Sequence, residues 1–232
     1  MKKLVLFTAL ILPLILTAQT NYISVEAQYL RTINSQGNKD LIKDDLRNAE
    51  LVTDSIIFKH LNDKAGDNVM ANLAYSYFLV RNYPMGYIAS VRYFLFYPNL
   101  EQKQMVLQIM YKCAQKSKLN VDPQQIISQI NDLKTFNSKL QYLLRQAIDI
   151  DKRQVVPFVQ NLVYQMQAHG EPVPFWAEQW LFFVNLGFSP SKARKMTDFS
   201  QIKTPATYTN FIKNLSGFNR FQVSLRMLCH KF

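Results

Sequence analysis

Glycine and cysteine are scarce in this sequence: the 232 residues include six glycines and two cysteines. All-β folds use many glycines in their turns, so the shortage favours helices. Hydrophobic residues make up 48% of the chain, which is enough to build a core without disulfide staples. The composition therefore predicts an all-α protein with one good-sized domain or two small ones.

The common catalytic and nucleotide-binding motifs are absent as well. The sequence contains no HExxH, CxxC, GxSxG, GxGxxG or phosphate-binding loop. Its glycines are isolated, so no loop can present several backbone N–H groups to a phosphate. We therefore expect no catalytic residue, no metal ion and no cofactor.

Two histidines are the remaining candidates for chemistry. His60 and Asp63 share one predicted helix face, which is half of a metal site, but no second pair of ligands accompanies them. His169 and Glu171 are close in a predicted loop and suit acid–base work. The same histidine suits a helix C-terminus, where the helix dipole stabilises it and Gly170 ends the helix.

A periplasmic enzyme that cuts cell-wall polymer is the main enzymatic alternative. Helical muramidases use a catalytic glutamate, and this chain has five: Glu26, Glu50, Glu101, Glu171 and Glu178. None of them lies in a recognisable motif of that kind. We therefore expect a protein that is not an enzyme.

The N-terminus has the pattern of a Sec-type signal peptide. Lys2 and Lys3 are followed by about fifteen apolar residues and then by Gln19. We expect a signal peptide over residues 1–19 and hence a periplasmic or secreted protein. The run is short for a membrane span, which needs about twenty apolar residues. An inner-membrane anchor that faces the periplasm is the alternative.

Basic residues outnumber acidic ones, 27 to 16, for a formal net charge of +11. The segment 187–232 alone carries +7, from eight bases and one acid. Such a segment suits an acidic protein, an anionic membrane surface or a glycan, unless it is only a solvated face. We expect no nucleic acid partner, since an exported protein rarely meets one.

Apolar residues recur at helical spacing along most of the chain. Helices are expected near 21–33 and 40–61, in an N-terminal region over residues 20–66 that Gly66 ends. A helical-repeat domain is expected over 67–232. Its helix pairs are expected to begin near 67, 101, 137, 173 and 205.

The first of these pairs has the clearest pattern. The apolar faces of its two helices hold Met70, Leu73, Tyr77, Val80, Ile88, Val91 and Leu95. Asp67 or Asn68 can cap the first helix. Pro84 suits the first turn of the second helix, and Pro98 ends it.

The spacing in this pair resembles a tetratricopeptide repeat. The matching positions, in order, are Met70, Leu73–Ala74, Tyr77, Tyr83, Gly86 and Pro98. The chain departs from the family pattern where Met70 replaces Trp, Gly86 replaces Ala and Ser90 replaces Phe. The resemblance covers about 15% of the chain and continues beyond it as spacing alone. It implies helical hairpins stacked as an α-solenoid, or a compact helical-repeat domain, with a groove for a protein partner.

Nine of the 28 residues from 72 to 99 are Tyr or Phe. We expect most of them to form the wall between packed helices. Tyr also suits a wall with one wet edge, which makes Tyr83 and Tyr87 candidates for partner binding.

A second aromatic stretch, PFWAEQWLFF, contains Trp176 and Trp180. Core packing is its favoured role, and a partner-facing hot spot is the alternative, because Trp beside basic residues is common at interfaces. The stretch that follows predicts a short helix with Ser189 as its N-cap. Its candidate partner-binding bases are Lys192, Arg194 and Lys195.

Cys113 and Cys229 fall in the second and the fifth predicted pair. Packed helices lie roughly 8–10 Å apart, so three stacked repeats separate these cysteines beyond the roughly 7 Å Cα limit of a disulfide. Two free, buried thiols are expected. Cys229 and His230 are adjacent and point apart on a helix, so a Cys–His dyad is not expected.

These patterns together predict an exported, non-enzymatic scaffold or adaptor that binds other envelope proteins. It would be a subunit of a bacterial cell-envelope assembly for secretion, surface structures or motility. The alternatives are the periplasmic enzyme and a peripheral membrane or glycan binder that uses segment 187–232.

Overall fold

The computed structural model describes residues 39–59, 64–97 and 100–197. Every regular element in these residues is a helix, and no strand occurs among them, so the all-α prediction is confirmed for this part of the chain. The chain divides into two compact units, residues 1–112 and 113–232, and the division falls inside helix α5. The sequence had suggested residue 67 as the start of the repeat domain.

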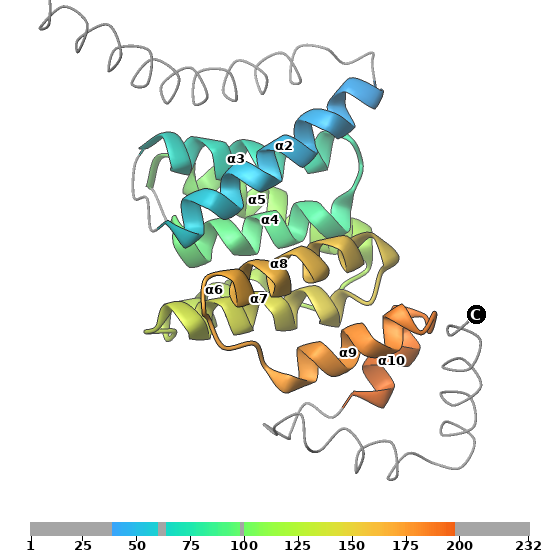
Figure 1. Cartoon of the computed structure of the whole chain (residues 1–232). Helices are drawn as coiled ribbons and strands as arrows, with labels where there is room; N and C mark the ends of the chain where they lie inside the picture. The colour runs from blue at the N-terminus through green and yellow to red at the C-terminus, as the bar shows by residue number, and fades with distance from the viewer. Residues whose placement is uncertain (1–38, 60–63, 98–99, 198–232) are drawn as a thin grey trace, which may run out of the picture. The chain divides into compact units, whose positions relative to one another are not determined.

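The first unit contains α2 (Lys39–Phe58), α3 (Lys64–Leu79), α4 (Tyr83–Phe96) and most of α5 (Leu100–Ser117). Helix α3 packs closely against α4, and α2 packs against α3. Figure 1 shows these helices in blue to green. The predicted pair within 67–100 is therefore a true helical hairpin.

The predicted apolar faces of α3 and α4 point into the core. The buried members are Met70, Leu73, Tyr77, Ile88, Val91 and Leu95, each no more than 7% exposed. Val80 is partly exposed at the end of the hairpin. Pro84 lies in the first turn of α4, as predicted, because a first-turn residue needs no backbone N–H donor. Helix α4 ends at Phe96, two residues before Pro98.

The predicted start of α3 was wrong by one turn. The helix begins at Lys64, so Gly66, Asp67 and Asn68 lie within it, and Gly66 does not end the preceding helix. Glycine keeps its N–H donor and disfavours a helix by only about 1 kcal/mol relative to alanine, so it does not by itself end one. The helix expected near 21–33, the last pair from 205 and Cys229 lie outside the described residues.

The second unit contains the end of α5, then α6 (Pro123–Asn131), α7 (Phe136–Ile150), the 3₁₀ turn η1 (Arg153–Val155), α8 (Val156–Ala168), α9 (Phe175–Asn185) and α10 (Pro190–Met196). Polar side chains cap the N-termini of three of these helices. Asp122 accepts from the N–H of Gln124 at 3.0 Å, Thr135 forms a capping box with Ser138, and Ser189 accepts from the N–H of Lys192 at 3.3 Å. The N-cap predicted at Ser189 is confirmed.

Helices α7 to α10 contact one another in a cycle. Helix α7 packs against α8, α8 against α9, α9 against α10, and α10 contacts α7. Figure 1 shows α7 and α8 side by side. Their core includes Leu140, Leu143, Leu144, Ile148, Val159, Met166, Trp180 and Phe183, each fully or almost fully buried. The solenoid and the tetratricopeptide likeness stay predictions.

Four of the helices end in the same way. One of the first two residues after the helix has positive φ, namely Arg81 (61°), Lys118 (56°), Gly170 (73°) and Gly187 (81°). The next N–H then bonds back to the carbonyl five residues earlier, as from Asn82 to Tyr77 at 3.0 Å. This Schellman arrangement satisfies the last carbonyls and turns the chain sharply. Short, rigid connections between helices follow from it.

We predict that the loss of stability on replacing a leucine of the first unit by alanine follows the burial of that leucine. Leu73 is 1% exposed and Leu51 is 51% exposed. Leu73→Ala should lower the free energy of unfolding by about 2–5 kcal/mol, because it removes buried methyl groups and leaves a cavity. Leu51→Ala is the matched control and should cost about 0.5 kcal/mol or less. Denaturant unfolding measures both, and equal losses would contradict the described packing.

Candidate functional site

A buried cluster of charged groups lies in the first unit, between α2, α3 and α4. Arg92, on α4, is 1% exposed. Its Nη1 donates to Oδ1 of Asp54 at 2.8 Å, and its Nη2 lies 3.8 Å from Oε1 of Glu50. Both acids come from α2, where a separation of four residues places them on one face. We call Glu50, Asp54 and Arg92 the charge cluster.

The charge cluster holds two carboxyl groups and one guanidinium. Burial raises the pKa of Glu50; Arg92 lowers it in part, Asp54 raises it further, and a hydrogen bond from Tyr77 of α3 lowers it. Burial alone would lower the pKa of Arg92, but the charges of Asp54 and Glu50 raise it above its ordinary value. The cluster therefore favours a charged Arg92–Asp54 pair beside a carboxyl group that retains its proton to higher pH.

Two roles fit this chemistry. A carboxyl group with a raised pKa beside an ionised carboxylate is the arrangement that acid catalysts use. The same groups also link α2 to α4 through an ion pair, since a buried charge must be paired. The side chain of Glu50 is 18% exposed and that of Asp54 is 3% exposed, so Glu50 is the more accessible of the two acids.

Sequence reasoning named Glu50 among five glutamates and gave no role to Asp54 or Arg92. Two signals were available. Glu50 and Asp54 have the i, i+4 spacing of a shared helix face, and Arg92 is a lone charge in the apolar helix α4. A base at such a position requires an acid from another element, but its spatial neighbour cannot be read from the chain order.

The two tyrosine candidates of the first unit have different environments. Tyr87 is 1% exposed and belongs to the core, so it offers no surface to a partner. Tyr83 is half-buried, and its ring centroid lies 5.9 Å from that of Phe78. The Nζ of Lys112 lies 5.7 Å from the Phe78 ring centroid, in a cation–π contact. Of the two tyrosines, Tyr83 alone remains a candidate for binding.

The two tryptophans of the second unit lie inside it. Trp180 is fully buried and Trp176 is 8% exposed. Beside them Phe183 makes edge-to-face contacts with Phe182 and Phe188, at centroid distances of 5.5 and 6.1 Å. The core role expected for this stretch agrees with their burial, which leaves little of either tryptophan for a partner.

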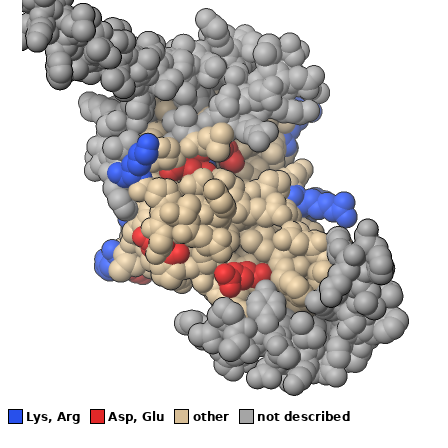
Figure 2. Space-filling view, in the orientation of Figure 1, with Lys and Arg blue, Asp and Glu red and all other residues tan. Residues whose placement is uncertain are grey.

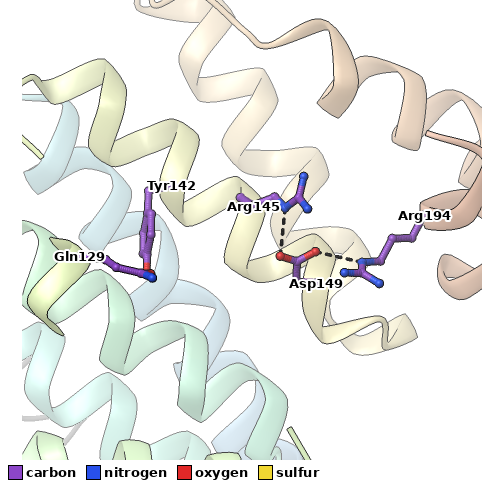
Figure 3. Close-up of polar contacts among 5 residues, drawn as sticks. All are labelled: Gln129, Tyr142, Arg145, Asp149 and Arg194. Atoms are coloured by element: carbon purple, nitrogen blue, oxygen red, sulfur yellow. Dashed lines mark hydrogen bonds and ion pairs between the residues drawn. The ribbon is translucent and has the colours of Figure 1, made fainter. Parts of the chain in front are cut away.

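The three candidate bases of α10 are not equivalent. The Nε of Arg194 donates to Oδ1 of Asp149 on α7 at 2.9 Å, and the Nε of Arg145 donates to Oδ2 of the same aspartate at 2.9 Å (Figure 3). Arg194 therefore serves to hold α10 on α7. Lys195 is exposed and Lys192 is half-buried, so these two remain candidates for a partner.

Figure 3 also shows the contact between α6 and α7. The hydroxyl of Tyr142 donates to Oε1 of Gln129 at 2.8 Å. Burial raises the pKa of Tyr142 to about 12, so this hydroxyl keeps its proton and its donor role at physiological pH. The contact is structural.

The other candidates for chemistry gain little support. His169 is exposed at the C-cap of α8, and Gly170 follows with positive φ, so the predicted place at a helix C-terminus is confirmed. Glu171 accepts from Nδ2 of Asn137 at 3.3 Å. Burial raises the pKa of the Cys113 thiol to about 12; it is buried and forms no disulfide, as expected, and it is a poor nucleophile.

Several candidates lie outside the described residues, namely His60, Asp63, Glu26, Cys229 and His230. Within residues 39–59, 64–97 and 100–197, no group of three or more His, Cys, Asp or Glu side chains is placed to hold a metal ion. Nor does any helix in this part of the chain have the length and apolar character to span a bilayer. Among the described residues on the face shown in Figure 2, Lys and Arg side chains lie in separate spots.

Comparison of the chain with protein-family models, with curated proteins and with solved structures found no match. The roles assigned to its residues therefore rest on their geometry and chemistry.

We predict that replacing Asp54 in the charge cluster destabilises the protein far more than replacing Asp149 in the second unit. Asp54→Asn should lower the free energy of unfolding by about 3 kcal/mol, because it leaves the buried guanidinium without its closest counter-charge. Asp149→Asn is the matched control: its side chain is 32% exposed, solvent screens its pairs, and about 1 kcal/mol or less should be lost. Urea unfolding compares the two, and a larger loss for Asp149 would contradict this assignment.

Glu50 should give the protein a distinctive pH dependence. The folded protein retains its proton above the ordinary glutamate pKa of 4.5, where the unfolded chain releases it. The Glu50 contribution to the free energy of unfolding should therefore fall as pH rises from about 4.5 to the raised pKa, by at most about 1.4 kcal/mol per pH unit. Glu50→Gln should remove this fall. Unfolding of both proteins from pH 4 to 8 measures it, and a constant difference would refute the raised pKa.

Proposed function

We propose that this protein is an exported, non-enzymatic scaffold that binds another protein within a bacterial cell-envelope assembly. The observation that carries the proposal is the architecture. Helices make up 80% of the described residues, and tight turns join several of them. Proteins built of packed helical hairpins offer broad, rigid faces to partners and seldom provide the loop-borne groups that catalysis needs.

The distribution of side chains supports this proposal. Most of the aromatic candidates are used in the cores of the two units, as Tyr87 and Trp180 show. The candidates that stay accessible are basic or aromatic, namely Lys192 and Lys195 on α10 and Tyr83 on α4. Surfaces of this composition are common at interfaces, where aromatic and basic side chains contribute much of the binding energy.

The proposed export from the cytoplasm is inferred from the N-terminal sequence. Two lysines, a short apolar run and a polar stretch are the parts of a secretory signal, and they lie in residues 1–38, which the structure does not describe. The basic residues from 198 onward also lie outside the described residues. A positive net charge suits an acidic partner in the envelope.

The scaffold proposal predicts a stoichiometric protein partner. Cross-linking in the native envelope fraction, followed by affinity recovery, should retrieve that partner with a chain that starts near Gln19 or Thr20. Mass spectrometry reads both the partner and the N-terminus. Recovery of the mature chain alone would overturn the scaffold proposal, and an intact Met1 would favour the membrane anchor.

A cell-wall hydrolase is the second candidate, and the raised pKa of Glu50 is the observation that favours it. Purified peptidoglycan is the substrate for a direct test. A scaffold should release no soluble fragments from it. Release by the wild type that is lost in Glu50→Gln, while folding is retained, would establish the enzyme instead.

A further inference from the structure

A partly exposed group of side chains lies where α3 turns into α4. The rings of Phe78 and Tyr83 lie with their centroids 5.9 Å apart and their planes at 55°, and both side chains are half-buried. The Nζ of Lys112, on α5, lies 5.7 Å from the Phe78 centroid. We call Phe78, Tyr83 and Lys112 the aromatic platform. All three belong to the first unit.

Exposed residues flank the platform in the sequence. Leu79 follows Phe78 and is 37% exposed, and Tyr111 precedes Lys112 and is 40% exposed. Arg81 is exposed in the turn, where its positive φ and its N–H bond to the Phe78 carbonyl at 3.1 Å fix the backbone. Phe78, Arg81 and Tyr83 therefore stand on a rigid turn between two helix ends, so little backbone entropy is lost when a partner binds.

The part of the sequence that carries the platform is basic. Between residues 68 and 121 the sequence has six bases, and its one acid is Glu101. Arg92 is neutralised inside the charge cluster, whereas Arg81 and Lys112 are exposed. Glu101 lies eleven residues before Lys112 on α5, or roughly 16 Å along the helix axis, which is beyond the screening length at physiological salt. No carboxylate of α5 therefore offsets the charge of the platform.

We propose that the aromatic platform binds an acidic segment of a partner protein, in which carboxylates flank an aromatic or aliphatic side chain. The carboxylates pair with Lys112 and Arg81, and the apolar side chain packs on Tyr83, Phe78 and Leu79. The cation–π contact favours a Lys112 ammonium beside the rings before the partner arrives, and aromatic rings lose little entropy on binding. This inference rests on the proposed function, since it names the surface and the chemistry of the partner.

The test uses the full chain and a short fluorescein-labelled peptide of alternating glutamate, phenylalanine and serine, with binding followed by fluorescence anisotropy. A second peptide carries glutamine in place of glutamate. The glutamate peptide should bind more tightly, and added salt should weaken it. Equal binding of the two peptides would overturn the proposed charge recognition.

Variants of the platform, each with a matched control, test whether the platform is the surface that binds the peptide. Arg81→Gln with Lys112→Gln should weaken binding of the glutamate peptide by roughly tenfold, and Tyr83→Ala by roughly fivefold. The matched controls are Lys152→Gln with Arg153→Gln, and Tyr164→Ala, all at exposed positions of the second unit. The controls should bind within about twofold of the wild type. An unchanged affinity in the platform variants, or equal losses in the controls, would overturn the proposal.

Two further outcomes separate this inference from the function on which it rests. If envelope cross-linking recovers the same partner with the wild type and with the Arg81/Lys112 double variant, the scaffold stands and the platform is wrong. If the wild type recovers no partner, the scaffold itself is wrong. Binding to anionic phosphatidylglycerol vesicles with no binding to the glutamate peptide would also overturn the platform and favour a membrane surface.

Discussion

The neutralisation of Arg92 is the constraint on which the first unit depends. A guanidinium inside an apolar helix pair must have a carboxylate beside it, and α2 supplies two on one face. Such a pair adds little net stability over apolar packing, because both ions lose their hydration, but its loss is costly. One placement of α2 brings both acids to the guanidinium. The charge cluster therefore selects that placement among the many that apolar contacts would allow.

The second unit is stabilised by a different set of interactions. Its ion pairs around Asp149 are about one third exposed, so solvent screens them and they contribute little. Its helices are defined instead by side-chain caps, by prolines in first turns and by a core that includes Trp180. Apolar contacts are non-directional, so the order of helices around this core follows from the short connections between them.

Aromatic residues suit both packing and recognition, and burial decides which of the two uses is open to each of them. Tyr83 and Tyr87 are one helical turn apart on α4, yet the first is half-buried and the second is in the core. Residue type could not separate them, since tyrosine suits both a core and a wet edge. Position at the first turn of the helix leaves Tyr83 beside the connection to α3, where solvent and a partner have access.

The sequence by itself predicted that the described residues are helical, roughly where several helix pairs begin, and the first-turn Pro84 and N-cap Ser189, because helical spacing, proline and polar caps act locally. It also indicated which faces of α3 and α4 are buried. It did not place α2 against α4, join Arg194 to Asp149, or show that Lys112 covers Phe78. These contacts join residues 34 to 45 positions apart. Only the tertiary structure decides them, because such contacts depend on the distance between two side chains in the folded protein. That distance cannot be read from their separation along the chain.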